Sequence, residues 1–143
     1  MSTFNPRIVG FVCRWCSSAG ADLAGTSRVK YPPNITLVKV MCSGRVDAQH
    51  VMQAFRSGAD GVLVSGCHPG DCHYIKGNYS MLRRYHLLKR MLKQMGIEEG
   101  RLRLEWISAT EADKLKEVVE QMVETIRGLG PLKPAREKAH AKV

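Results

Sequence analysis

Two thiols and two imidazoles fall within seven residues of this sequence, at Cys67, His68, Cys72 and His73. The loop that carries them also contains glycine and proline, which allow a tight backbone path around a bound group. It follows the apolar run 62–64, which predicts a buried strand. Thiolates and imidazoles are ligands for metals and groups for redox chemistry, so we expect the chemistry of this protein in this loop.

The three other cysteines are Cys13 and Cys16, in the motif Cys-Arg-Trp-Cys, and Cys42. Runs rich in β-branched residues predict strands over 7–12 and 35–41, and these end directly before Cys13 and Cys42. A third predicted strand, 61–65, ends just before Cys67. A purely structural use of buried cysteine would not require a cysteine after each of three strands.

The elements that must position these cysteines follow from hydrophobic periodicity. A fourth strand is predicted over 101–107. Helices are predicted weakly within 19–28, then after Asp47, from about Met81 to Gly96, and after a capping box formed by Thr110 and Asp113. The methionines at helical spacing are expected to fill the core. This alternation predicts an α/β fold, flavodoxin/Rossmann-like, with a four-stranded parallel sheet, helices on both faces and strand order 2-1-3-4.

That strand order brings the cysteines together. Cys13 would leave the central strand, with Cys42 and Cys67 leaving its two neighbours. Adjacent strands lie about 4.8 Å apart, so the three sulfurs can meet at the carboxyl edge, where open α/β sheets bind ligands. Cys16 or Cys72 would complete the site.

Composition favours one globular domain, 1–130, followed by a basic tail, 131–143. No apolar run approaches the ~18 residues of a membrane span, and the first residues lack the apolar stretch of a signal peptide. We therefore expect a cytoplasmic protein. In that reducing compartment, five cysteines indicate metal ligands or redox thiols before disulfides.

The formal net charge of +9 suits an acidic partner. Nucleic acid is not favoured, because aromatic residues make up only 6% and no nucleic-acid-binding motif is visible. The basic helix 81–95 and the tail are instead candidates for docking on acidic protein surfaces.

Several chemistries remain open for the cysteines. The residues allow a zinc-binding interaction module, or a thiol-disulfide oxidoreductase that uses Cys13 and Cys16. An iron-sulfur cluster held by four thiolates accounts for more of the pattern and leaves one thiol over. Four cationic or titratable side chains near the cysteines could counter its negative charge: Arg14, Arg45, His68 and His73.

Four motifs in order make the sequence resemble the delta subunit family of methyl-viologen-reducing hydrogenase. They are Cys-Arg-Trp-Cys at 13–16, Met-Cys-Ser-Gly-Arg-Val-Asp at 41–47, Ser-Gly-Cys-His-Pro-Gly-Asp-Cys-His-Tyr at 65–74 with Gly77-Asn78-Tyr79, and Arg-Leu-Arg-Leu-Glu-Trp-Ile-Ser-Ala at 101–109. The resemblance covers roughly residues 7–128.

The resemblance implies an electron-transfer subunit with a 2Fe-2S cluster and no substrate-converting site of its own. It implies that four of Cys13, Cys16, Cys42, Cys67 and Cys72 bind the cluster, without deciding which four. The implied partners are the small and large subunits of a nickel-iron hydrogenase, or a formate dehydrogenase, on one side. The flavin subunit of heterodisulfide reductase is implied on the other.

Overall fold

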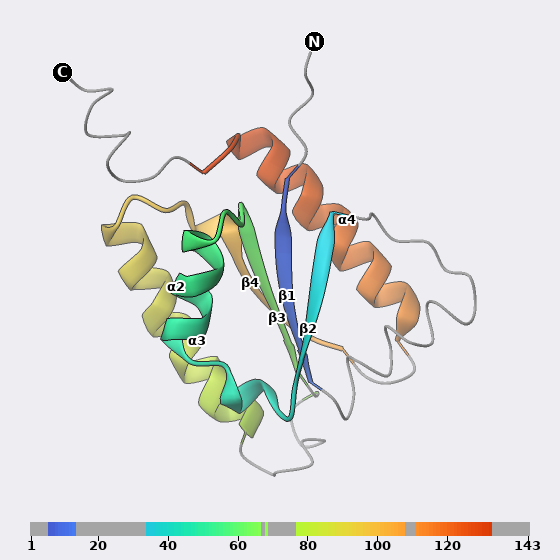
Figure 1. Ribbon diagram of the computed structural model, residues 1–143. Coiled ribbons are helices and arrows are strands. Elements are labelled where there is room, and N and C mark those ends of the chain that lie inside the picture. The colour runs from blue at the N-terminus through green and yellow to red at the C-terminus, as the bar shows by residue number, and fades with distance from the viewer. Residues whose placement is uncertain (1–5, 14–33, 67, 69–76, 108–110, 133–143) are drawn as a thin grey trace, which may run out of the picture.

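The computed structural model describes residues 6–13, 34–66, 68, 77–107 and 111–132, which form a parallel sheet between helices (Figure 1). The strands are β1 (Ile8–Cys13), β2 (Ile35–Val40), β3 (Gly61–Gly66) and β4 (Leu102–Trp106). All three strand pairs are parallel and the order is β2-β1-β3-β4. The predicted α/β fold and strand order are therefore confirmed.

The described helices cover both faces of the sheet, as Figure 1 shows. The helices α2 (Ala48–Arg56) and α3 (Gly77–Gln94) lie on one face, and α4 (Ala112–Leu129) lies on the other. Side chains of a strand alternate between the faces. Accordingly, Val62 and Val64 pack in the cluster under α2 and α3, whereas Leu63 packs against α4. The helix predicted within 19–28 lies outside the described residues.

The helix boundaries follow local sequence signals. The helix α2 ends at Ser57 and Gly58, where Gly58 has a φ of 106°, a conformation that glycine adopts without strain. Glu111 occupies the N-cap of α4 without a capping side-chain hydrogen bond, and its carboxylate pairs with His68. Thr110, the first residue of the predicted capping box, lies outside the described residues.

The fourth strand, predicted over 101–107, is observed as β4 one residue shorter at each end, since Arg101 belongs to a short 3₁₀ turn, η2 (Glu99–Arg101), and is buried. One expectation about packing was wrong. Of the two methionines at helical spacing, Met81 is buried, whereas Met95, which follows the last residue of α3, is exposed. Met91, which lies about a quarter-turn from the buried row of Leu88 and Leu92, is exposed as well.

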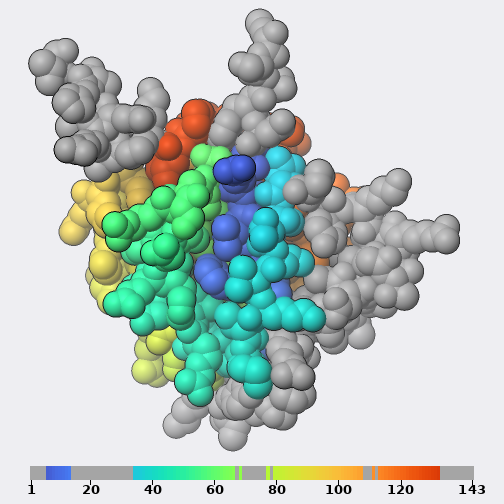
Figure 2. Space-filling model, viewed as in Figure 1, coloured from blue at the N-terminus to red at the C-terminus, as the bar shows by residue number. Residues whose placement is uncertain are grey.

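Strand β2 forms one edge of the sheet and is only partly covered. Figure 2 shows atoms of β1 (blue) and β2 (cyan) at the surface beside α2. Thr36 and Val38 on β2 are exposed on this side. Within the described ranges, no helix is long and apolar enough to cross a lipid bilayer.

Candidate metal centre

Cys13 is the last residue of the central strand β1, and its side chain is buried, with 1% exposed. Its thiol donates to the carbonyl oxygen of Met41 over 3.8 Å. Met41 directly precedes Cys42, which lies two residues beyond the end of β2. The sheet therefore brings the segments carrying Cys13 and Cys42 side by side at its carboxyl edge, as the sequence predicted.

Cys42 is also buried, and a short turn fixes the backbone that follows it. The 3₁₀ turn η1 (Ser43–Arg45) has Cys42 at its N-cap. The backbone N–H of Gly44 donates to Cys42 Sγ over 3.5 Å, and Arg45 N donates to the Cys42 carbonyl oxygen over 2.9 Å. A sulfur that accepts an N–H bond is suited to carry negative charge, because the bond stabilises the thiolate.

Helix α3 holds this turn from outside. Arg84 Nη1 donates to the carbonyl oxygen of Gly44 over 2.9 Å and also to that of Val46. Gly44 packs so closely on the start of α3 that a Cβ there would lie 2.8 Å from the carbonyl oxygen of Gly77. The position of Cys42 is thus coupled to α3 through η1.

The end of β3 approaches the same turn. A Cβ on Gly66 would lie 2.6 Å from Ser43 Oγ and 3.4 Å from the Trp106 ring, so a larger residue here would force Ser43 to shift. The backbone N–H of Ile107 donates to the Gly66 carbonyl oxygen over 2.9 Å, which anchors the end of the strand. The described end of β3, directly before Cys67 in the sequence, therefore lies at the same edge as Cys13 and Cys42.

Ser43 is buried between these segments, and its Oγ has no hydrogen-bond partner within the described part of the chain. A buried hydroxyl without a partner costs about 1–3 kcal/mol. Such an atom at the junction of Cys42 and Gly66 is a candidate donor to a bound group.

The remaining predicted site residues have mixed outcomes. Cys16, Cys67, Cys72, Arg14 and His73 lie outside the described residues. Arg45 is exposed at the end of η1. His68 Nε2 pairs with Glu111 Oε1, and both side chains are about one-third exposed. Across the described ranges, no group of three or more His, Cys, Asp or Glu side chains is gathered for a metal ion.

Three residues at or near this edge were not predicted from the sequence: Ser43, Arg84 and Glu111. Ser43 had a detectable signal, since it directly follows a candidate ligand. Arg84 had none, because it stands in a run of helical cations. Glu111 lies 43 positions from His68, and only the folded chain brings them together.

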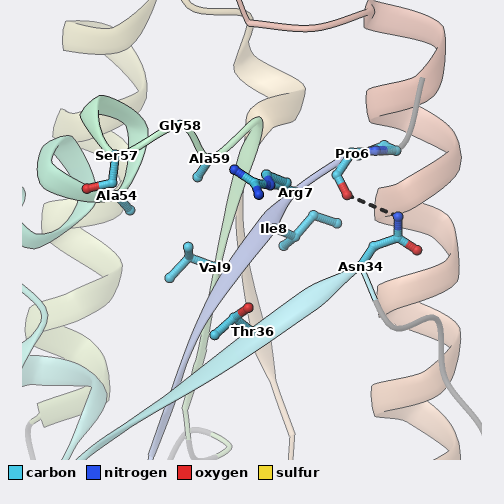
Figure 3. A pocket seen from close by; sticks show the side chains of 10 residues that line it. All are labelled: Pro6, Arg7, Ile8, Val9, Asn34, Thr36, Ala54, Ser57, Gly58 and Ala59. Carbon is cyan, nitrogen blue, oxygen red and sulfur yellow. Dashed lines mark hydrogen bonds between the residues drawn. The ribbon is translucent and has the colours of Figure 1, made fainter.

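The opposite edge of the sheet is built differently. A cavity of about 470 Å³ lies there, at the amino ends of β1 and β2, where Asn34 Nδ2 donates to the Pro6 carbonyl oxygen over 3.0 Å (Figure 3). Its lining includes Arg7 but no cysteine, histidine or carboxylate of the described residues. Cys13 and Cys42 therefore lie at the other end of the sheet from this cavity.

Comparison with known proteins yields one family and several similar chains. The model of the family described as methyl-viologen-reducing hydrogenase, delta subunit, matches residues 8–130. The chain is 51% identical over 130 residues to the iron-sulfur subunit of F420-non-reducing hydrogenase from Archaeoglobus profundus, covering 91% of this chain and 95% of that protein. It is 48% identical over 128 residues to the iron-sulfur subunit of the vhc F420-non-reducing hydrogenase from Methanococcus voltae, covering 90% and 89%.

A longer relative contains a similar segment. It is one subunit of the ferredoxin/F(420)H(2)-dependent CoB-CoM heterodisulfide reductase of Methanosarcina acetivorans. The chain is 45% identical to it over 127 residues, covering 89% of this chain and 16% of that protein. The family match spans all the described strands and helices. The chain belongs to the methyl-viologen-reducing hydrogenase delta subunit family.

Proposed function

We propose that this chain carries one 2Fe-2S cluster at the carboxyl edge of its sheet. It relays single electrons between a hydrogenase, or a formate dehydrogenase, and heterodisulfide reductase. The observation that carries the proposal is the pair of buried thiols, Cys13 and Cys42, at the ends of adjacent strands, beside the strand end that leads into Cys67. The names of two relatives, which call them iron-sulfur subunits, support an iron-sulfur group.

The proposed ligands are four of the five cysteines: Cys13, Cys16, Cys42, Cys67 and Cys72. Four thiolates are the usual ligand set of a 2Fe-2S centre. The fifth thiol would lie beside the cluster without binding iron.

The described residues fit such a group. Cys13 and Cys42 offer sulfur in a buried setting, and sulfur is the donor that iron-sulfur clusters take. The Gly44 N–H on Cys42 Sγ is the kind of hydrogen bond that tunes the potential of a cluster. The Ser43 hydroxyl, which has no partner among the described residues, supplies a further donor at the same edge.

The protein's own residues would hold and insulate the group. Arg84 and the close contact of Gly44 with α3 keep the Cys42 backbone fixed, which limits movement when the charge of the site changes. Arg14, Arg45, His68 and His73 are proposed to balance the negative charge around the thiolates. The cluster, when bound, would supply a one-electron carrier, and the proposal requires no acid, base or nucleophile from the chain.

The proposed partners are hydrogenase subunits or formate dehydrogenase as donor, and the flavin subunit of heterodisulfide reductase as acceptor. The match to 16% of a longer heterodisulfide reductase chain supports contact with that enzyme, because a segment like this chain is part of it there. A single α/β domain over 1–130, a basic tail over 131–143 and a cytoplasmic location belong to the same proposal.

Burial argues against dithiol exchange as the main activity. A catalytic dithiol presents an accessible thiolate, whereas Cys13 is 1% exposed. An activity that depends on attack by Cys13 is therefore less favoured than metal binding.

The decisive test is the iron, acid-labile sulfide and zinc content of protein purified without oxygen. It is combined with electron paramagnetic resonance after dithionite reduction. We expect about two irons and two sulfides per chain, with a signal in the reduced state. One zinc and no iron would overturn the proposal and leave a zinc-binding module.

A further inference from the structure

Most of the large apolar side chains that the structure shows as exposed lie on one helix. Seven large hydrophobic residues are exposed in the described part of the chain, and four of them lie on α3 or directly after it: Tyr79 43%, Leu87 59%, Met91 40% and Met95 48%. The four are separated by multiples of four residues, so they follow one slowly turning row along the helix. We call this row the α3 stripe.

The same helix is strongly cationic. It carries five cations and no acidic residue: Arg83, Arg84, Lys89, Arg90 and Lys93. Three of them have local roles, since Arg84 bonds to η1, Lys89 Nζ lies 5.0 Å from the Tyr85 ring centroid, and Lys93 lies 4.0 Å from Glu99. Arg83 and Arg90 are exposed and have no partner among the residues that the structure describes.

These two arginines bracket the most exposed apolar side chain. On a helix, the neighbours of Leu87 are the residues three and four positions away, which include Arg83, Arg90 and Met91. The α3 stripe therefore presents an apolar anchor between two guanidinium groups that pair with no described residue. Protein interfaces are enriched in arginine and in apolar anchors of this kind.

We propose that the α3 stripe docks a second protein subunit, one that offers an apolar pocket flanked by aspartate or glutamate. This inference rests on the proposed electron-transfer function, because it assigns the surface through which one partner is held. Charge complementarity favours that occupant, because a helix face with cations and no acidic residue is matched by carboxylates.

Other occupants fit the same observations less well. A second copy of this chain would set five cations against five. The chain's own residues 133–143 contain four Lys or Arg residues and one Glu, so they carry the same sign of charge. A lipid surface requires a broad apolar face, and the broad apolar face of α3 is already buried in the core through Met81, Leu88 and Leu92.

One end of the α3 stripe lies near the turn that follows Cys42. Helix α3 begins at Gly77, which contacts Gly44 in the turn that follows Cys42. Tyr79 lies in this first turn of α3. A partner seated along the stripe would therefore extend to the edge of the sheet where the cluster is proposed (Figure 1).

The test compares two variants of the full chain with two matched controls. Leu87→Asp removes the anchor, and the double variant Arg83→Glu with Arg90→Glu reverses the flanking charge. The controls, Leu129→Asp and Arg127→Glu, change exposed residues of the same types on α4. The probes are the purified heterodisulfide reductase and the purified hydrogenase of the same organism, each immobilised for biolayer interferometry with cluster-loaded protein. Vesicles of phosphatidylglycerol are tested in parallel.

We expect both α3 variants to bind one of the two enzymes about tenfold or more weakly, with each control within about twofold of wild type. The double variant should also lose most of the salt dependence of binding. The proposed docking face would be overturned if the α3 variants kept wild-type affinity or if the controls lost as much affinity as they did. It would also be overturned if the wild type bound the vesicles but neither enzyme. Iron and sulfide content, measured on every sample, separates the two proposals. A loaded cluster with unaffected binding rejects only the docking face, whereas absence of iron in the wild type rejects the electron-transfer function.

Discussion

Arg84, on α3, donates a 2.9 Å hydrogen bond to the carbonyl oxygen of Gly44, 40 positions earlier in the chain. The N–H of the same Gly44 donates to the sulfur of Cys42. One peptide segment thus connects the basic surface of α3 to a candidate cluster ligand. Arg84 is therefore already hydrogen-bonded within the chain, whereas the neighbouring Arg83 is not paired with any described residue.

Replacing Arg84 by glutamine should loosen η1, because the carbonyl oxygens of Gly44 and Val46 lose their donor. We expect a loss of about 1–3 kcal/mol in the free energy of unfolding and a lower iron content per chain. Urea unfolding and iron analysis measure the two effects. Arg83→Gln is the control, since Arg83 is exposed. Equal behaviour of the two variants would contradict the role given to Arg84.

Replacing each cysteine singly by serine should show which four of the five positions bind the cluster and which one does not. Four variants should lose the visible absorbance and the resonance signal of the reduced cluster, while one keeps both. Cys13 and Cys42 are expected among the four, because their thiols are buried at the strand ends. Circular dichroism checks that each variant is folded. Two folded variants with full iron content would exclude ligation by four cysteines.

Gly66→Ala should destabilise the protein by about 1–3 kcal/mol, because the added Cβ meets both Oγ and Cβ of Ser43. The matched control is Gly128→Ala in α4, where nothing lies within 4 Å of the added Cβ. That change should instead stabilise the helix by about 0.5–1 kcal/mol. Thermal unfolding followed by circular dichroism measures both. A neutral Gly66→Ala would mean that Ser43 moves aside at little cost.

Ser43→Ala tests whether the buried hydroxyl donates to the proposed cluster. Losing a donor to the sulfurs should shift the reduction potential to a more negative value, since hydrogen bonds stabilise the more negative reduced state. Potentiometric titration followed by paramagnetic resonance gives the potential. The control is Ser57→Ala, whose hydroxyl bonds to the Gln53 carbonyl oxygen at the far end of α2. An unchanged reduction potential in Ser43→Ala would contradict a hydrogen bond from the Ser43 hydroxyl to the cluster.

Arg101→Met should affect stability without affecting the metal site. Buried Arg101 donates to the carbonyl oxygens of Asp60 (2.9 Å) and Gly130 (2.7 Å) and pairs with Glu98 (2.5 Å), at the amino edge of the sheet. Removing it should cost about 3–5 kcal/mol, whereas Arg103→Met, in a more exposed pair, should cost within about 1 kcal/mol. Urea unfolding compares them. A loss of iron from folded Arg101→Met protein would contradict the view that Arg101 and the proposed metal site lie at separate edges of the sheet.

Much of the fold was predictable because its signals are local. The runs of β-branched residues placed β1, β2 and β3 to within one residue at each end. The alternation of strands and helices indicated a parallel sheet, and the predicted strand order 2-1-3-4 is the observed one. The last predicted helix is observed as α4, and its apolar residues Leu115, Val118, Val119, Met122 and Ile126 are all buried.

Burial could not be predicted where a residue's surroundings come from distant segments. The side chain of Arg101 is enclosed by the ends of β3, α4 and η2, which no local pattern reveals. Met91 and Met95 are apolar, as core residues are, yet no described helix or strand packs over them.

The sequence by itself determined that a cysteine follows each of three strands, and that parallel strands bring these ends to one edge. Both facts depend only on where the cysteines stand along the chain and on the residue pattern that predicts the strands. Only the tertiary structure decided which of two adjacent arginines, Arg83 or Arg84, supports η1. Consecutive helical residues point about 100° apart, so the choice depends on where the chain that leaves β2 meets α3.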